Sequence, residues 1–344
     1  MSVRLALVTA LGLTMAMAFA GTATAGGITA GNLIVIDNVN GTVDDINPTT
    51  GTGFVIASGF SDAHGLAINA QGTIFVSDIG NGTTIPPVID QVSPQGVVTP
   101  FSSNTLGTGP TMFRPFQMAF LGNTLYVADG GTANGNTTEV YTVATSGNRT
   151  LVAGNSGSSN NVFAQSLGGL AVSPTGTVFV SQATGTPTIY KIDTSTTPAT
   201  VTTLTSALNS PQGLAFSNNQ LLANQGVNPP SVQSINPSTG TPTIVSGNGI
   251  GSGTDFGGVK GITVGNGFIY VTDVINDEIF AVNPSNGNRS PLSTSIAFGS
   301  LTFVIAVYPT VATAVPEPSS AVLMALGLAG LAAYAGRRAT RRAA

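Results

Sequence analysis

The sequence predicts an all-β protein: a six-bladed β-propeller of four-stranded antiparallel blades, closed by pairing of its N-terminal and C-terminal strands. A signal peptide and a C-terminal apolar helix are expected to flank it. Three observations lead to this prediction. One short pattern recurs six times at intervals of about 39 to 53 residues, its apolar runs are nearly continuous, and the first and last copies are incomplete in complementary ways. The predicted propeller spans residues 26–310.

Each copy of the pattern begins with two apolar strands. The second strand is clearest at 125–129, which reads Leu-Tyr-Val-Ala-Asp, and its relatives lie at 33–37, 74–78, 178–182, 221–224 and 269–273. Five copies have a preceding strand, mostly close to Gly-Leu-Ala, at 65–68, 117–120, 169–172, 213–216 and 261–264. Third strands follow, for example at 139–143, and fourth strands are expected at 54–56, 96–98, 150–152 and 243–245. A four-stranded unit cannot bury both faces alone, so neighbouring units must stack around an axis.

The two ends of the predicted domain complete one another. Only a few residues separate the expected signal peptide from the copy at 33–37, so that copy lacks an innermost strand. Residues 299–305 look like an innermost strand with nothing after it. We therefore expect the C-terminal strand to pair with residues 33–57, which removes the open edges that favour aggregation.

The repeated strands resemble NHL-repeat and related TolB-like six-bladed propellers over about residues 31–307. In those families a Gly-[Leu/Ile]-Ala-[Val/Ile] strand precedes a Tyr-Val-Ala-Asp strand and an Asp-x-x-Asn turn. Matching pairs in this chain are Asp37 with Asn40, Asp78 with Asn81, and Asp273 with Asn276. Gln182 and Asn224 take the place of the Asp in two copies. The resemblance implies a fold, and function must be argued from the site.

The N-terminal residues 1–25 have the three-part pattern of a signal peptide. Arg4 supplies an early positive charge, an apolar run follows, and Ala23 and Ala25 form a small-x-small cleavage site. Cleavage is expected after Ala25. The alternative is an uncleaved membrane anchor.

Residues 311–344 are expected to be a sorting tail, and their order resembles the PEP-CTERM signal of Gram-negative bacteria. The tail has a Pro-Glu-Pro motif at 315–318, a chargeless apolar segment at 321–335 and a basic end at 337–342. Its motif residues are Val315, Pro316, Glu317, Pro318, Arg337, Arg338, Arg341 and Arg342. An apolar helix at 321–335 would be about 22 Å long against a ~30 Å hydrocarbon core, so it would anchor the chain only transiently.

This resemblance implies a partner and a location. The arginines should keep the C-terminus of a single-pass precursor in the cytoplasm, with the propeller across the inner membrane. An exosortase would then recognise the motif, cleave near it and release the domain to the periplasm, the cell surface or the extracellular matrix. A permanent single-pass anchor is the alternative.

The composition excludes several functions. Between 26 and 314 there are five basic residues against thirteen acidic ones, which argues against nucleic acid as a partner. The chain has no cysteine, so disulfides cannot hold it together. His64 is the sole histidine, and no catalytic, cofactor-binding or metal-binding residue is predicted. Positions just before the Gly-Leu-Ala strands should approach the mouth of a propeller channel, and the candidates there are His64, Phe116, Gln212 and Lys260.

Bound Ca²⁺ is a further possibility, because the Asp residues after the second strands could form a carboxylate ring. Their periodicity instead favours hydrogen bonds to backbone N–H groups in each turn. Gluconolactonase-like propellers use a Glu, an Asn and an Asp around a divalent cation in the channel. This chain has three Glu residues, and none is on an expected innermost strand: Glu139, Glu278 and Glu317.

Two functional hypotheses follow. The favoured one is an exported surface or matrix protein whose non-catalytic propeller binds an envelope or matrix component such as exopolysaccharide. The alternative is a metal-dependent lactonase or lyase acting at the channel. A scaffold of the TolB type rests on fold analogy alone.

Overall fold

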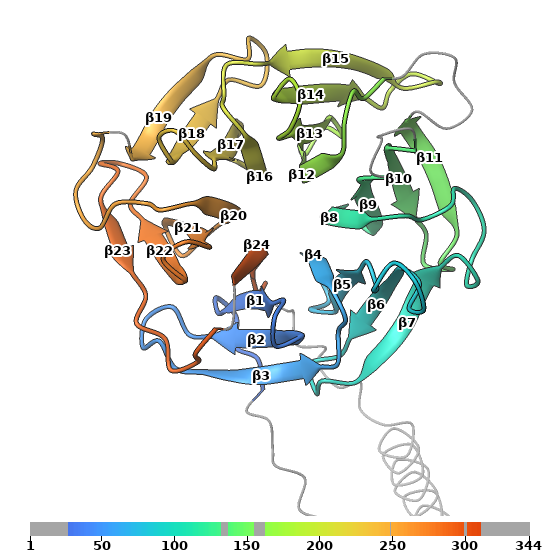
Figure 1. Cartoon of the computed structure of the whole chain (residues 1–344), viewed down its shortest axis with the longest axis horizontal. Helices are drawn as coiled ribbons and strands as arrows, with labels where there is room; N and C mark the ends of the chain where they lie inside the picture. Colours follow the sequence, from blue (N-terminus) through green and yellow to red (C-terminus); the bar gives the residue numbers. More distant parts are fainter. Residues whose placement is uncertain (1–26, 132–136, 155–161, 248, 299–300, 311–344) are drawn as a thin grey trace, which may run out of the picture.

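The structure is a computed structural model that describes residues 27–131, 137–154, 162–247, 249–298 and 301–310. These residues form six four-stranded sheets arranged in a ring, with one strand of each sheet nearest the axis (Figure 1). The described residues contain no helix that is long and apolar enough to cross a membrane. The predicted all-β, six-bladed propeller is confirmed. The expected signal peptide (1–25, with Ala23 and Ala25) and sorting tail (311–344) lie outside the described residues.

In every blade the strands follow one another from the axis of the ring to its rim. Blade 1 consists of β24 (Leu301–Val307), β1 (Leu33–Asp37), β2 (Thr42–Ile46) and β3 (Gly53–Ser58). Blade 2 consists of β4 (Ala63–Ile68), β5 (Ile74–Asp78), β6 (Val88–Val92) and β7 (Val98–Ser103). Blade 3 consists of β8 (Pro115–Leu121), β9 (Thr124–Asp129), β10 (Glu139–Val143) and β11 (Arg149–Gly154). Blade 4 consists of β12 (Leu167–Val172), β13 (Val178–Gln182), β14 (Thr188–Asp193) and β15 (Thr200–Thr205). Blade 5 consists of β16 (Pro211–Ser217), β17 (Gln220–Gln225), β18 (Ser231–Ile235) and β19 (Pro242–Gly247). Blade 6 consists of β20 (Val259–Gly265), β21 (Phe268–Asp273), β22 (Glu278–Val282) and β23 (Arg289–Pro291).

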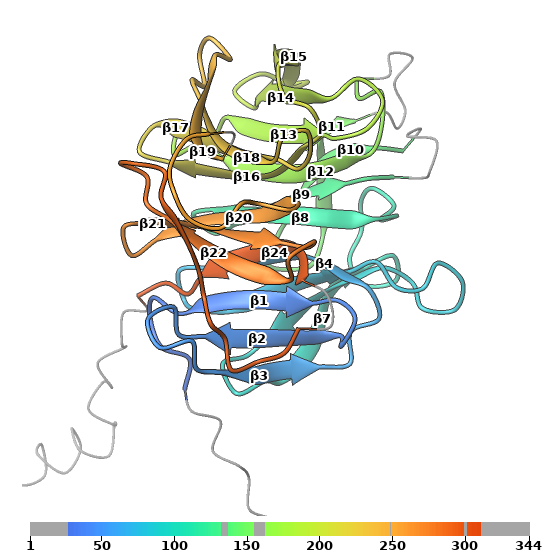
Figure 2. The same cartoon turned by 60° about the vertical axis from the view of Figure 1, so that its left-hand side comes forward.

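Blade 1 closes the ring with strands from both ends of the domain. β24 pairs antiparallel with β1, so that Leu33 lies opposite Val307, and the two strands lie side by side in both views (Figures 1 and 2). The pairing continues past the strands, because Gly31 N donates to Tyr308 O at 2.9 Å and Tyr308 N donates to Asn32 O at 2.8 Å. The predicted closure is therefore confirmed.

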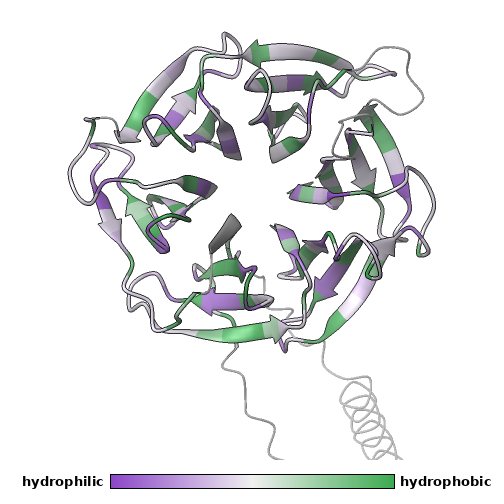
Figure 3. Ribbon diagram, in the orientation of Figure 1, coloured by the Kyte–Doolittle hydropathy of each residue, from purple (hydrophilic) through white to green (hydrophobic). Residues whose placement is uncertain are grey.

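The cores lie between neighbouring blades, which explains the nearly continuous apolar runs. All five residues of β1 are buried. Successive side chains of a strand point to opposite faces. Leu33 and Val35 pack in one cluster with Tyr270 of blade 6, whereas Ile34 and Ile36 pack in another that contains residues of blade 2. Hydrophobic segments accordingly occur on strands of every blade (Figure 3).

The Gly-Leu-Ala glycines allow the innermost strands to approach one another. A Cβ on Gly169 would lie 2.3 Å from the carbonyl oxygen of Gln212 in the next blade. That carbonyl accepts a hydrogen bond of 2.7 Å from Ser181 Oγ, on the second strand of the same blade as Gly169. Ser77 bonds to Phe116 O in the same way at 2.9 Å. The glycine therefore makes room for a hydrogen bond that links one blade to the next.

Asn224 also makes hydrogen bonds from one blade to the next, as Ser77 and Ser181 do. This shows that the sequence alignment of its repeat was wrong by one residue. The sequence pattern places Asn224 at the position of the Asp that follows the second strand. In the structure it is Gln225 that pairs with the first residue of its innermost strand, as Gln182 and Asp129 do. Asn224 instead donates through Nδ2 to Lys260 O and Gly261 O at 3.0 and 2.8 Å. The one-residue error arises because Asn and Gln both resemble the Asp to which they are compared.

The prediction for one fourth strand was also wrong. The sequence predicts a strand at 96–98, but β7 runs from Val98 to Ser103. Gly96 adopts a φ of 80° and its N–H bonds to Ser93 O at 2.8 Å, so it closes the preceding hairpin turn. A left-handed φ of this kind suits glycine in a turn.

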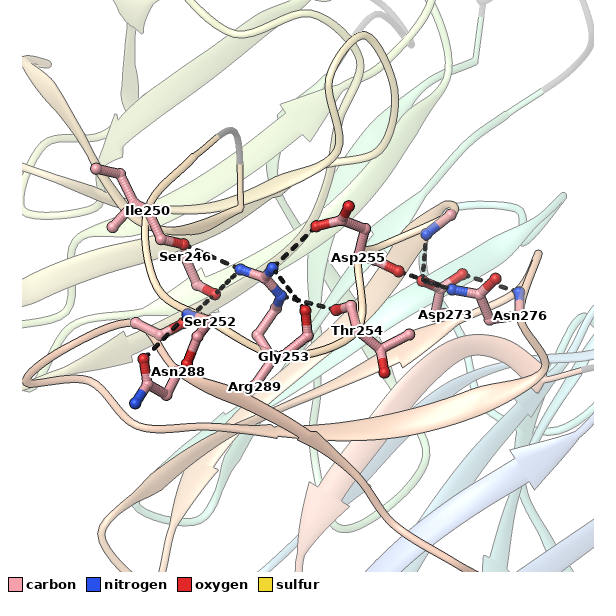
Figure 4. Close-up of polar contacts among 12 residues, drawn as sticks. Ser246, Ile250, Ser252, Gly253, Thr254, Asp255, Asp273, Asn276, Asn288 and Arg289 are labelled. Atoms are coloured by element: carbon pink, nitrogen blue, oxygen red, sulfur yellow. Dashed lines mark hydrogen bonds and ion pairs between the residues drawn. The ribbon is translucent and has the colours of Figure 1, made fainter.

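Two buried arginines hold the long loops at the rims of blades 3 and 6. Arg289 donates to the carbonyls of Thr254 and Ile250, each at 2.9 Å, and to Asp255 Oδ1 at 3.0 Å (Figure 4). Arg149 contacts Pro110 O and Ser103 O in the equivalent way, each at 2.7 Å. Both cations are therefore structural, because their donors are used by backbone carbonyls and by side-chain oxygens of the same loops and strands.

Candidate functional site

A pocket of about 390 Å³ opens at the axis, on the side where the innermost strands of blades 2 to 5 begin. Its walls come from the first residues of these strands, from the loops before them and from the loop after β13. The lining residues are His64, Arg114, Phe116, Gln117, Gln165, Ser166, Leu167, Gly168, Gly169, Ala183, Thr184, Gln212 and Gly213. We call this site the mouth pocket. Its volume is within the range of small-molecule sites.

The polar residues that end the second strands hold the loops of the mouth pocket in place. Asp129 accepts hydrogen bonds from the backbone N–H groups of Phe113 and Arg114 at 2.9 and 2.8 Å, and from Gly131 N at 2.8 Å. Gln182 accepts the Gln165 N–H at 2.9 Å. These side chains therefore form hydrogen bonds within their own turn, as expected, and also with the loop that precedes the innermost strand of the blade.

Arg114 is the cation of the mouth pocket. Its guanidinium carbon lies 4.8 Å from the centre of the Phe116 ring, a cation–π distance. Within the described residues the guanidinium has no carboxylate or hydrogen-bond partner. The stacked geometry fixes the group while leaving its N–H donors available to a ligand.

His64 lies beside Phe116, with the ring centres 5.1 Å apart in an edge-on arrangement. Its Nε2 lies 2.9 Å from Asp62 Oδ1, and Asn38 Nδ2 donates to the same oxygen at 2.8 Å. Burial lowers the pKa of His64, and Asp62 opposes this shift. The lowered pKa disfavours the charged imidazolium, so Arg114 carries the permanent positive charge of the pocket.

Amide and hydroxyl side chains complete the lining. Gln212 Nε2 donates to Ser210 Oγ at 2.7 Å, which leaves its second amide hydrogen and its oxygen for other partners. Ser166 Oγ is buried and has no hydrogen-bond partner in the described part of the chain. Gln117 and Gln165 line the same space.

The structure brings three of the four predicted channel-mouth residues together. His64, Phe116 and Gln212 line the mouth pocket, whereas Lys260 is not among its lining residues. Burial lowers the pKa of Lys260, and its backbone carbonyl accepts the inter-blade bond from Asn224. Sequence reasoning missed Arg114, because it lies in a loop that is not part of the repeat.

The residues present do not fit the divalent cation of gluconolactonase-like propellers. The lining of the mouth pocket contains no carboxylate, and the described residues contain no group of three or more His, Asp or Glu side chains that could hold a metal ion. Asp78, Asp129 and Asp273 each accept at least three backbone N–H bonds instead. No metal-dependent step therefore follows from these residues.

The fold and the pocket define this protein as a six-bladed β-propeller with a small-molecule-sized site at its axis. Residues 116–300 match the family described as a repeat of unknown function, DUF6923, and the chain belongs to that family. Residues 314–342 match the PEP-CTERM protein-sorting motif. The motif assigns the protein to export and to a surface or extracellular location in Gram-negative bacteria. No curated protein matches the chain in sequence.

Solved structures support the fold. The chain is similar to a chain in the nidogen/laminin complex, with a TM-score of 0.63 and 15% identity, covering 82% of this chain and 99% of that one. It is also similar to XC5397 of Xanthomonas campestris, a gluconolactonase, with a TM-score of 0.56 and 16% identity, covering 70% of this chain and 79% of that one. Identities this low establish the propeller fold alone.

Proposed function

We propose that this protein is an exported surface or matrix protein whose non-catalytic propeller binds an extracellular component, such as exopolysaccharide, at the mouth pocket. The PEP-CTERM motif supports the location. The observation that carries the binding role is the position of the mouth pocket on the face opposite Gly31 and Tyr308, where the described propeller begins and ends.

The two faces follow from the direction of the innermost strands. These strands begin at the mouth pocket and end at their turns into the second strands. Residues near both ends of the described propeller contact such turns: Asn266 Nδ2 donates to Gly31 O at 2.8 Å, and Tyr308 Oη donates to Gly72 O at 3.1 Å. A chain that continues from Tyr308 into a sorting tail therefore leaves the mouth pocket facing away from its attachment.

Processing by an exosortase is part of this proposal. The precursor would be held transiently in the inner membrane with its basic end in the cytoplasm, and cleavage near Val315, Pro316, Glu317 and Pro318 would free the propeller. The first experiment is fractionation of the native host with and without its exosortase. We expect the protein in the surface or extracellular fraction of the parent strain and in the membrane fraction of the deletion strain, and Glu317→Ala should reproduce the deletion. The same distribution in all three strains would contradict the proposal.

The binding role needs a second experiment. Extracellular material from the host, immobilised on a support, should retain the exported protein, and a mature exported protein without a propeller should pass through. Failure to retain the propeller protein at any ionic strength would contradict a matrix-binding role.

The alternative function is a metal-dependent lactonase or lyase. Its support is the fold shared with a gluconolactonase. Metal analysis and melting temperature with and without added Ca²⁺ separate the two functions. Stoichiometric divalent metal, or a rise of several degrees on adding Ca²⁺, would favour the enzyme.

A further inference from the structure

The geometry points to a carboxylate-bearing saccharide, such as a uronic acid unit, as the ligand of the mouth pocket, with Arg114 as the residue that binds its carboxylate. This inference rests on the proposed function and adds the chemical class of the ligand.

The charge balance of the mouth pocket is the first step. Arg114 is the only lining residue with a permanent charge, and its guanidinium has no carboxylate partner within the described residues. Asp62 accepts hydrogen bonds from His64 and Asn38 and is not among the lining residues. The lining itself therefore presents one permanent positive charge and no negative one. An anionic ligand group would form a charge-assisted, bidentate contact there.

The rigidity of Arg114 is the second step. Its backbone N–H is bound by Asp129, and its guanidinium stacks on Phe116. Phe116 is itself held through its carbonyl, which accepts the 2.9 Å bond from Ser77. A side chain fixed in this way loses little conformational entropy when a ligand binds.

The surrounding charges decide which anion fits. The chain carries thirteen acidic and five basic residues between 26 and 314, so a polyanion with a dense run of phosphates would be repelled. One guanidinium matches one singly charged carboxylate. Nucleic acid and polyphosphate are therefore disfavoured, and an acidic sugar unit is favoured.

The polar lining favours a saccharide over an acidic peptide. Gln165 and Gln212 carry amides that can both donate and accept, and the Ser166 hydroxyl has no partner among the residues described. Sugar hydroxyls also donate and accept, so they can satisfy such groups in several orientations. A saccharide carries several such hydroxyls on each unit, whereas a peptide backbone offers one N–H and one C=O per residue.

The test is calorimetric titration of the exported protein with acidic trimers, trisaccharides that each contain one galacturonate, glucuronate or mannuronate unit, each compared with its fully neutral counterpart. We expect at least one acidic trimer to bind at least tenfold more tightly than its neutral counterpart. Arg114→Gln should weaken that binding at least tenfold. Lys191→Gln, which removes the same charge from β14, should leave it unchanged. Equal binding of acidic and neutral trimers, no binding of any acidic trimer, or full affinity in Arg114→Gln would each overturn the inference. Tighter binding of triglutamate than of every acidic trimer would replace the saccharide with an acidic peptide.

A matched retention experiment separates this inference from the proposed function. Host extracellular material is tested before and after chemical reduction of its carboxyl groups to alcohols. We expect retention of the parent protein to fall after reduction. Retention that persists after reduction and in Arg114→Gln would overturn the acidic ligand while leaving the matrix-binding role intact. Titration with an acidic trimer that succeeds while native material fails to retain the protein would leave the site intact and contradict the matrix role.

Discussion

Asp45 shows how the fold changes the chemistry of a single residue. It lies on β2 with 1% of its surface exposed, and neither carboxylate oxygen has a hydrogen bond of good geometry among the described residues. Burial raises its pKa to about 6, and the Asn32 side chain opposes this shift only in part. Asp44 and Asp90 also have a pKa of about 6, in each case chiefly because they are buried.

These three carboxyls should make the protein most stable in mildly acidic solution. Their pKa values in the folded state lie above the ordinary value of 3.8, so their protonation stabilises the fold fully below about pH 4 and is lost as the pH rises through about 6. His64, whose pKa is lowered, acts in the opposite direction, but burial also raises the pKa of Asp129, which adds to the effect of the three. The melting temperature of the parent should therefore fall between about pH 5 and pH 7.

Asp45→Asn isolates one of these groups. The variant keeps the shape of the side chain but cannot ionise, so it should melt at a higher temperature than the parent at about pH 7.5. The two proteins should converge near pH 4. A parent melting temperature that rises from pH 5 to pH 7, or a variant that is less stable at pH 7.5, would show that the carboxylate is not strained by burial.

At the scale of the strand, the close approach of neighbouring innermost strands limits which residues they can contain. A Cβ on Gly169 would lie 2.3 Å from Gln212 O, whereas one on the adjacent Gly168 would have its nearest contact at 3.6 Å, with Ser181 Oγ. We expect Gly169→Ala to lower the free energy of unfolding by about 2 kcal/mol or more, because backbone must move. Gly168→Ala should change it by less than about 0.5 kcal/mol. Urea unfolding measures both, and equal effects would mean that the inter-blade approach does not limit the fold.

The elements that the sequence predicted well are those whose burial repeats from blade to blade. The runs at β5, β9, β13 and β21 are buried on both faces, so their apolar pattern carries the architecture. Outer strands are poorly specified because they are partly exposed. The strand β7, whose predicted bounds were wrong, begins with three exposed residues and ends in buried serines. Which of the adjacent residues Asn224 and Gln225 takes the place of the Asp depends on their partners: Asn224 bonds to the next blade, and Gln225 pairs with Pro211. The sequence alone does not reveal these partners.

The mouth pocket was only partly predictable for a related reason. His64, Phe116 and Gln212 occupy equivalent positions of the repeat, so their approach to the axis follows from the repeat itself. Arg114 and Gln165 lie in loops between blades, whose lengths and sequences differ. Their position depends on Asp129 and Gln182, which reach back from the second strands. The sequence does not show that Asp129 and Gln182 bind these loops, because the contacts form only in the folded protein.

At the scale of the whole molecule, the fold separates attachment from binding. The first and last described residues of the propeller lie at one face, where Gly31 N and Tyr308 O are hydrogen-bonded, and the mouth pocket opens at the other. Blade 1 closes the ring, because it is the one described blade that is built from strands far apart in sequence. Opening the ring therefore requires breaking the β1–β24 ladder as well as the contacts between blades.

A circular permutant tests this closure. Joining residues 27 and 310 through a short Gly-Ser linker and opening the chain between Ser206 and Ala207, both exposed, makes every blade from consecutive strands. We expect the permutant to fold, since the original ends are adjacent, but to unfold at a lower urea concentration than the parent. The reason is that its ring is closed only by contacts between blades 4 and 5, with no strand shared between the two ends of the chain. A permutant as stable as the parent would show that side-chain packing between blades, rather than the shared blade, holds the ring closed.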